Sequence, residues 1–191
     1  MDHNEILVFD TGPLRHFATN GWLGALKAVV GGRQAFIPDT VITELRRSAS
    51  ADSSIQTVLE ADWLEHRALQ TAEELAAFGR FAGLLVRGTR NVGEAGVLAL
   101  AAVSGGTAVI DDGAARQAAR VAGVPFRPTL ALLCEAIRDG LLTVSLVSAL
   151  VDDLLGGSYR LPFRAGDFAH WAADNGLLDQ PEVESSPGSP A

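Results

Sequence analysis

Short runs of apolar residues alternate along this chain with longer segments in which apolar residues recur at helical spacing. The runs at 6–9, 35–37 and 107–110 are each followed within a few residues by such a segment. A short buried strand followed by a helix, repeated several times, is typical of a parallel sheet with helices on both faces. We therefore expect an α/β fold built on a central, mainly parallel sheet.

Weaker patterns extend the same alternation. Residues 63–69 and 124–126 are further strand candidates, and 141–144 is ambiguous. Capping residues, helical spacing and terminal glycines predict the helices. These are expected after Thr11, which can cap the first of them, at 22–30, after Asp39 or Thr40, and at 53–59, 73–85, 93–103 (with Asn91 as a possible cap), 114–122, 129–139, 147–155 and 168–175.

The chain of 191 residues is long enough for one domain with a sizeable core. We expect this domain at 1–160, a helical extension at 161–179, and a disordered tail at 180–191, where Pro, Ser, Gly and Glu predominate. No apolar run approaches the roughly 20 residues that span a bilayer. The first residues lack the basic region of a secretory signal, and Cys134 is the only cysteine. A cytoplasmic protein with neither an internal disulfide nor a cysteine-based zinc site is expected.

Acidic residues stand where the predicted strands and helices meet. Asp10 ends the first apolar run, and Asp111 and Asp112 end the run at 107–110. Glu44 lies one turn into a predicted helix, and Glu94 lies near the start of another. Ligands of parallel α/β sheets gather at the carboxyl ends of the strands, where the following helices also begin. The sequence therefore predicts that these acids, from four separate segments, converge on one pocket.

Several carboxylates in one pocket repel one another, and a bound divalent cation relieves the repulsion. Mg²⁺ and Mn²⁺ prefer oxygen ligands and commonly bind a few carboxylates together with substrate phosphate. We therefore predict Asp10, Glu94 and one or both of Asp111 and Asp112 as ligands of Mg²⁺ or Mn²⁺, in a site for phosphodiester hydrolysis. One of the two adjacent aspartates is expected only to cap the helix that begins near Ala114.

The net charge of −8 argues against a general nucleic-acid coat protein. All fifteen basic residues except Lys27 are arginines, however, and several follow or precede the acids closely. Arginine binds phosphate in a two-pronged fashion. We predict Arg15, Arg46, Arg90 and Arg116 as contacts to a substrate phosphate backbone, although exposed arginines that balance nearby acids would give the same pattern.

Four segments together resemble the PIN-domain nucleases of bacterial and archaeal toxin–antitoxin systems. They are 8–14 (VFDTGPL), 37–45 (IPDTVITEL), 91–101 (NVGEAGVLALA) and 108–119 (AVIDDGAARQAA). Their order and spacing cover roughly residues 5–160, and the ordered set is more specific than any single segment.

The resemblance implies a three-layer α/β/α fold and an endoribonuclease that depends on Mg²⁺ or Mn²⁺. By motif, Asp10, Glu44 and Glu94 match the first three acids of the family. The fourth is Asp111 or Asp112, and Thr11 matches a hydroxyl residue that assists at the site. The resemblance further implies RNA as substrate, a homodimer, and a small antitoxin protein as partner.

Other protein families with similar strand and helix patterns require residues that this sequence lacks. A haloacid-dehalogenase-type phosphatase needs an acid at position 12, which is Gly12, and a phospho-receiver domain needs a lysine after a late strand, whereas the only lysine is Lys27. Neither a dinucleotide-binding nor a P-loop glycine motif is present. Two alternatives stay open: a PIN-like interaction module with weak or no catalysis, and a nuclease that acts on DNA.

Overall fold

A five-stranded parallel sheet forms the centre of the protein, whose computed structural model describes residues 4–157 and 159–178. The strand order is β3-β2-β1-β4-β5, and every neighbouring pair is parallel. The strands are β1 Ile6–Phe9, β2 Gln34–Pro38, β3 Glu65–Arg67, β4 Thr107–Val109 and β5 Phe126–Arg127. The expectation of a mainly parallel α/β sheet is confirmed.

Helices connect and follow the strands throughout the described residues. They are α1 Thr11–Thr19, α2 Leu23–Val30, α3 Asp39–Ala49, η1 Ser53–Ile55, α4 Gln56–Leu59, α5 Ala72–Leu85, α6 Val92–Ser104, α7 Gly113–Ala122, α8 Thr129–Arg138, α9 Val144–Gly156 and α10 Phe168–Asp174. Among residues 4–157 and 159–178, none of these helices has the length and apolar character needed to cross a membrane.

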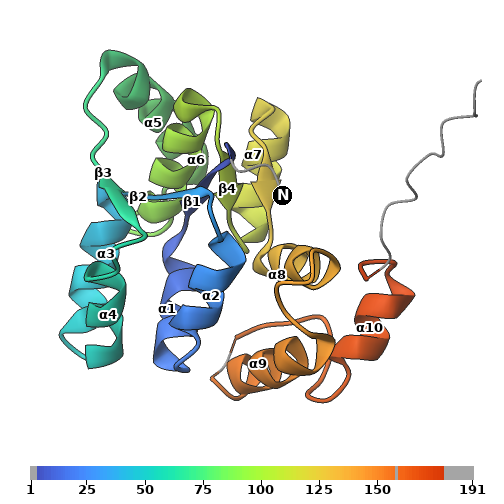
Figure 1. Cartoon of the computed structure of the whole chain (residues 1–191). Helices are drawn as coiled ribbons and strands as arrows, with labels where there is room; N and C mark the ends of the chain where they lie inside the picture. Colours follow the sequence, from blue (N-terminus) through green and yellow to red (C-terminus); the bar gives the residue numbers. More distant parts are fainter. Residues whose placement is uncertain (1–3, 158, 179–191) are drawn as a thin grey trace, which may run out of the picture.

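The helices lie on both faces of the sheet (Figure 1). Helices α5, α6 and α7 pack together on one side, and α6 contacts β1, β2 and β4 directly. Helices α1 and α2 lie on the other side, and α2 contacts α8. Helices α8, α9 and α10 follow β5 and form a separate group at the lower right of the view. This is the three-layer α/β/α arrangement that the resemblance implied.

Most predicted elements occur close to their expected positions. The candidate at 63–69 contains only the short strand β3, and the segment at 141–144 has no strand. The prediction that Thr11 caps the first helix is wrong, because α1 begins at Thr11 and Asp10 holds the N-cap position. Residues 179–191, which include the predicted tail at 180–191, lie outside the described part of the chain.

The registers of the central strands bring several chain segments to one edge. Phe9 pairs with Val109, and Val8 pairs with Phe36. Since these strands are parallel, Asp10 and the segment after β4 leave the sheet side by side, and the start of α3 lies beside them. The carboxyl edge of the sheet therefore carries the starts of α1, α3 and α7.

Helices α3 and α6 approach each other closely at a glycine. A Cβ atom added to Gly96 would lie 2.0 Å from Oγ1 of Thr40 and 3.1 Å from its Cβ and Cγ2. The remaining α6 positions around it, Ala95 and Val97 to Ala101, are buried, so the helix is held in the core on all sides. This close approach fixes the spacing between the helix that carries Glu44 and the helix that carries Glu94.

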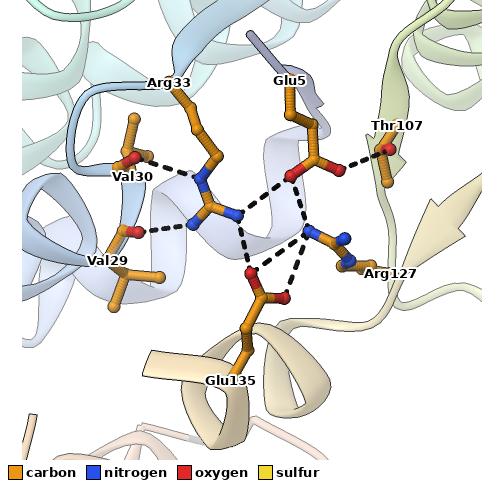
Figure 2. Close-up of polar contacts among 7 residues, drawn as sticks. All are labelled: Glu5, Val29, Val30, Arg33, Thr107, Arg127 and Glu135. Atoms are coloured by element: carbon orange, nitrogen blue, oxygen red, sulfur yellow. Dashed lines mark hydrogen bonds and ion pairs between the residues drawn. The ribbon is translucent and has the colours of Figure 1, made fainter. Parts of the chain in front are cut away.

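A buried ion-pair network joins the start of β1 to α8 (Figure 2). The Arg33 side chain is 1% exposed, and its Nη1 lies 3.1 Å from Glu5 and 2.9 Å from Glu135. Its other nitrogens donate to the carbonyl oxygens of Val30 and Val29, at 3.1 and 2.6 Å. Arg127 contacts the same two glutamates, at 2.8 and 3.2 Å. Each arginine of the network thus contacts two glutamates and each glutamate contacts two arginines. This compensation of charge makes burial of the Arg33 guanidinium tolerable.

Candidate active site

Asp10 lies at the end of β1 and is 6% exposed. Its backbone N–H still donates to Val109 at 3.2 Å, so the sheet ladder holds it in place. Oδ1 is buried and has no hydrogen-bond partner among the described residues. Burial raises the pKa of this carboxyl well above its usual range, and the charges of Glu94 and Glu44 raise it further, against the opposing effect of the N–H groups of Thr11 and Gly12. A buried carboxylate in this state lacks a compensating positive charge.

Glu44 extends from α3 across the starts of α1 and α6. The hydroxyl of Thr11 donates to Oε2 at 2.7 Å, and the backbone N–H of Gly93 donates to Oε1 at 2.9 Å. A Cβ on Gly93 would lie 2.7 Å from Oε2, so the contact requires a glycine at this position. Glu44 therefore joins the starts of α1 and α6 at the carboxyl edge of the sheet, and Thr11 is hydrogen-bonded directly to the Glu44 carboxylate.

Glu94 lies in the first turn of α6. Burial raises the pKa of its carboxyl, and the charges of Glu44 and Asp112 add to this, while its own backbone N–H at the helix start opposes the rise. Asn91, the N-cap of α6, has φ of 64°, and its side chain donates to the carbonyl oxygen of Leu85 at 3.2 Å. That turn aims the first residues of α6 at Glu44.

The two adjacent aspartates have different surroundings. Asp112 caps α7 by accepting the N–H of Ala115 at 2.8 Å, and its charge acts on Glu94. Both oxygens of Asp111 are engaged elsewhere, by the N–H and the hydroxyl of Thr129 at 2.9 and 2.6 Å and by the hydroxyl of Tyr159. The acids that act on one another electrostatically are thus Asp10, Glu44, Glu94 and Asp112. Asp112 is therefore both the cap of α7 and a member of this group.

The four arginines expected to contact substrate lie in different places. Arg15 on α1, Arg46 on α3 and Arg90 just before α6 are exposed. Arg116 on α7 lines a cavity of about 450 Å³ that also reaches Asp111. A second cavity, of about 270 Å³, borders Glu44, and it is lined by Arg47 and not by Arg46.

Sequence reasoning missed the groups that surround the acids from distant parts of the chain. Tyr159 donates to Asp111 across 48 positions, and its ring packs on His16 with centroids 4.6 Å apart. Burial raises the pKa of the Tyr159 hydroxyl far above its usual range, and the charge of Asp111 adds to the rise. Burial and the charge of Arg15 lower the pKa of His16. No local motif signals these contacts, since each joins segments that are remote in sequence.

A divalent cation fits the chemistry of the acids. The buried Oδ1 of Asp10 receives no hydrogen bond from the described residues, and the pKa values of both Asp10 and Glu94 are raised, as expected where negative charge is not compensated. Hard cations prefer such oxygen donors. Within residues 4–157 and 159–178, no three His, Cys, Asp or Glu side chains form a ready-made cation cage.

Comparison with known proteins gives a family match and distant structural likenesses. A family model described as a PIN domain matches residues 6–165. No curated protein matches the chain. A solved structure, that of VapBC2 from Rickettsia felis bound to a DNA fragment from their promoter, includes a chain 14% identical to this one, with a TM-score of 0.48 over 64% of this chain and 98% of that chain. The family match spans most of the sequence and includes Asp10, Glu44, Glu94, Asp111 and Asp112, and on that basis the chain belongs to the PIN domain family.

Proposed function

We propose that this protein is a metal-dependent endoribonuclease that hydrolyses RNA phosphodiesters. The observation that carries the proposal is the buried Oδ1 of Asp10, which has no hydrogen-bond partner in the described part of the chain and lies within the electrostatic influence of Glu94 and Glu44. Such a group is costly in a folded protein unless a ligand compensates it. Membership of the PIN domain family supports nuclease activity.

In this proposal Asp10, Glu94 and Asp112 hold Mg²⁺ or Mn²⁺. The ion would neutralise their charge, attract the substrate phosphate and lower the pKa of a bound water. Without a cation, like charges keep the carboxylates apart. Asp111 was the alternative fourth acid, but its oxygens already accept three hydrogen bonds, so we assign the fourth position to Asp112.

The remaining residues of the site would orient the reacting groups. Glu44, held by Thr11 and Gly93, keeps the starts of α1 and α6 in register and places a second negative charge beside Asp10. Arg116 and Arg47, one in each cavity beside the acids, are the cations best placed to meet the phosphates on either side of the cleaved bond.

RNA as substrate, a small antitoxin as partner, a homodimer and a cytoplasmic location belong to the same proposal. They rest on the resemblance to toxin–antitoxin nucleases. The alternatives are a nuclease acting on DNA and an interaction module of the same fold. The 2′-hydroxyl distinguishes the two nucleic acids, so paired RNA and DNA oligonucleotides of one sequence separate the first alternative.

The test is cleavage of single-stranded RNA with Mn²⁺ or with EDTA, together with calorimetric titration of Mn²⁺. We expect wild-type protein to bind Mn²⁺ and cleave, and Asp10→Asn and Glu94→Gln each to lose both properties. Glu65→Gln, which changes an exposed acid on β3, serves as the matched control. Cleavage retained in both site variants would reject the assigned site, and wild-type protein that neither binds Mn²⁺ nor cleaves would favour the interaction module.

A further inference from the structure

We propose that the larger cavity binds one nucleotide of the substrate strand beside the phosphate that is cleaved. The proposal rests on the nuclease function above and specifies a part of its substrate site. The residues that carry the argument are Asp111, Arg116, Tyr159, Arg160, Leu161 and Trp171. The volume of about 450 Å³ falls within the roughly 300–1,000 Å³ that is typical of small-ligand pockets.

The cavity borders the acidic group. Asp111, on its wall, directly precedes Asp112, whose charge acts on Glu94. The charge of Asp10 also reaches Tyr159 on the same wall and contributes to its raised pKa. A nucleotide in the cavity would therefore lie next to a phosphate held at the acids.

Two guanidinium groups in the cavity are available to a ligand. Arg116 and Arg160 form no ion pair with a carboxylate of the described residues. Arg33 and Arg127, by contrast, are each paired with two glutamates and have a structural role (Figure 2). Free arginines beside a cluster of acids are suited to an anionic ligand, and a phosphate matches their fork geometry.

Part of the cavity lining is apolar and aromatic. The Trp171 ring is half-buried and is held by Phe163, with ring centroids 5.0 Å apart. Leu161 also lines the cavity. An indole held in place beside arginines is a typical stacking surface for a nucleobase, and stacking tolerates every base because each has a π face.

The negative charge of Asp111 does not prevent a nucleotide phosphate from binding in the cavity, because the Asp111 carboxylate is already engaged by hydrogen bonds. Its two oxygens accept hydrogen bonds from the Thr129 N–H, the Thr129 hydroxyl and the Tyr159 hydroxyl. Asp111 thereby fixes the segment at 159–161 against the start of α8. We assign it as a positioning residue for the cavity, and the arginines as the groups that contact the ligand.

Binding should be measured in EDTA, so that it does not depend on cleavage. The probes are adenosine 5′-monophosphate, adenosine, and a fluorescein-labelled single-stranded RNA of eight nucleotides. The variants are Arg160→Ala and Trp171→Leu, with folding checked by circular dichroism. Arg164→Ala is the matched control, because Arg164 is exposed in the same connecting segment but does not line the cavity.

We expect the wild type to bind the nucleotide more tightly than the nucleoside. Arg160→Ala should weaken nucleotide and RNA binding roughly tenfold and leave the nucleoside nearly unaffected. Trp171→Leu should weaken all three probes by roughly 5- to 150-fold. Arg164→Ala should bind like the wild type.

Failure of this proposal can be told apart from failure of the proposed function. If RNA is cleaved in an Asp10-dependent way but the nucleotide does not bind, or Arg160→Ala and Arg164→Ala bind RNA equally, the cavity assignment is overturned and the nuclease stands. If nucleotide binding depends on Arg160 and Trp171 but no cleavage occurs, the cavity assignment holds and the nuclease fails. A cavity that binds a partner protein through Trp171 and no nucleotide would also overturn the assignment.

Discussion

Replacing the buried Asp10 with asparagine should stabilise the metal-free protein. Asp10 is 6% exposed, and its Oδ1 has no hydrogen-bond partner within residues 4–157 and 159–178. Leaving such a polar atom unpaired costs about 1–3 kcal/mol, and more when it is charged. The amide removes the charge and its repulsion by Glu94 and Glu44 while keeping the shape of the side chain. We expect the free energy of unfolding at pH 8 in EDTA to rise by about 1–3 kcal/mol, and Tm by roughly 2–12 °C.

The size of this effect should depend on pH. The pKa of Asp10 is raised in the folded protein, whereas an unfolded aspartate titrates near about 3.9. The favourable contribution of the protonated carboxyl is therefore fully present below the unfolded pKa and is lost as pH rises through the folded pKa. Wild type and Asp10→Asn should differ little near pH 4 and progressively more towards pH 8.

Adding Mn²⁺ should reverse the order of stability. A cation that binds only the folded wild type stabilises it by about 2.7 kcal/mol at a hundred times its Kd, whereas the variant lacks a ligand. The assay is thermal unfolding followed by circular dichroism at pH 4, 6 and 8, with EDTA or Mn²⁺, and with Glu65→Gln as control. If Asp10→Asn in EDTA is no more stable than the wild type at pH 8, and the difference does not change with pH, our account of the uncompensated carboxylate is refuted.

Two further substitutions test the surroundings of the site. Gly93→Ala places a Cβ 2.7 Å from the Glu44 carboxylate, so nuclease activity should fall. Tm should change little, because the flexible carboxylate can move aside and alanine favours a helix by about 1 kcal/mol. Gly79→Ala in α5, with open space around it, should keep full activity, and equal activity of the two variants would contradict the role of this contact. Arg33→Met removes a guanidinium from a side chain that is 1% exposed and should lower the free energy of unfolding by about 3–5 kcal/mol in urea titrations. Lys27→Met, at an exposed ion pair, should have little effect. Similar losses of unfolding free energy in the two variants would show that burial does not strengthen the network.

Local patterns in the sequence predicted the fold and indicated the candidate acids, because both depend on short-range signals. Apolar runs and helix caps fixed the alternation of strands and helices, and the parallel topology then required Asp10 and the segment after β4 to share an edge. The choice between Asp111 and Asp112 depended on Thr129 and Tyr159, which lie 18 and 48 positions away from Asp111. Contacts of this kind leave no periodicity to detect.

The same limit applies to the charged residues. Arg33 lies 102 positions from Glu135, and Arg127 lies 122 positions from Glu5. From the sequence these four residues look like any other surface charges, and only the packing of α8 against the start of β1 brings them together. Among the arginines near the acids in sequence, Arg116 and Arg47 line the cavities, but Arg160 comes from a segment with none of these acids nearby and could not be predicted in this way.

The position of these contacts along the chain bears on how the protein emerges from the ribosome. All four acids of the proposed site are made by residue 112. The groups that contact Asp111 and Arg33, namely Thr129, Glu135 and Tyr159, follow later. A nascent chain that ends near residue 120 contains β1 to β4 but leaves Arg33 without one of its two carboxylates and Asp111 without its donors. At roughly 5–20 residues per second, synthesis from residue 120 to Tyr159 takes about 2–8 seconds. During that time the nascent chain thus carries the four acids without the hydrogen bonds from Thr129 and Tyr159 that engage the neighbouring Asp111.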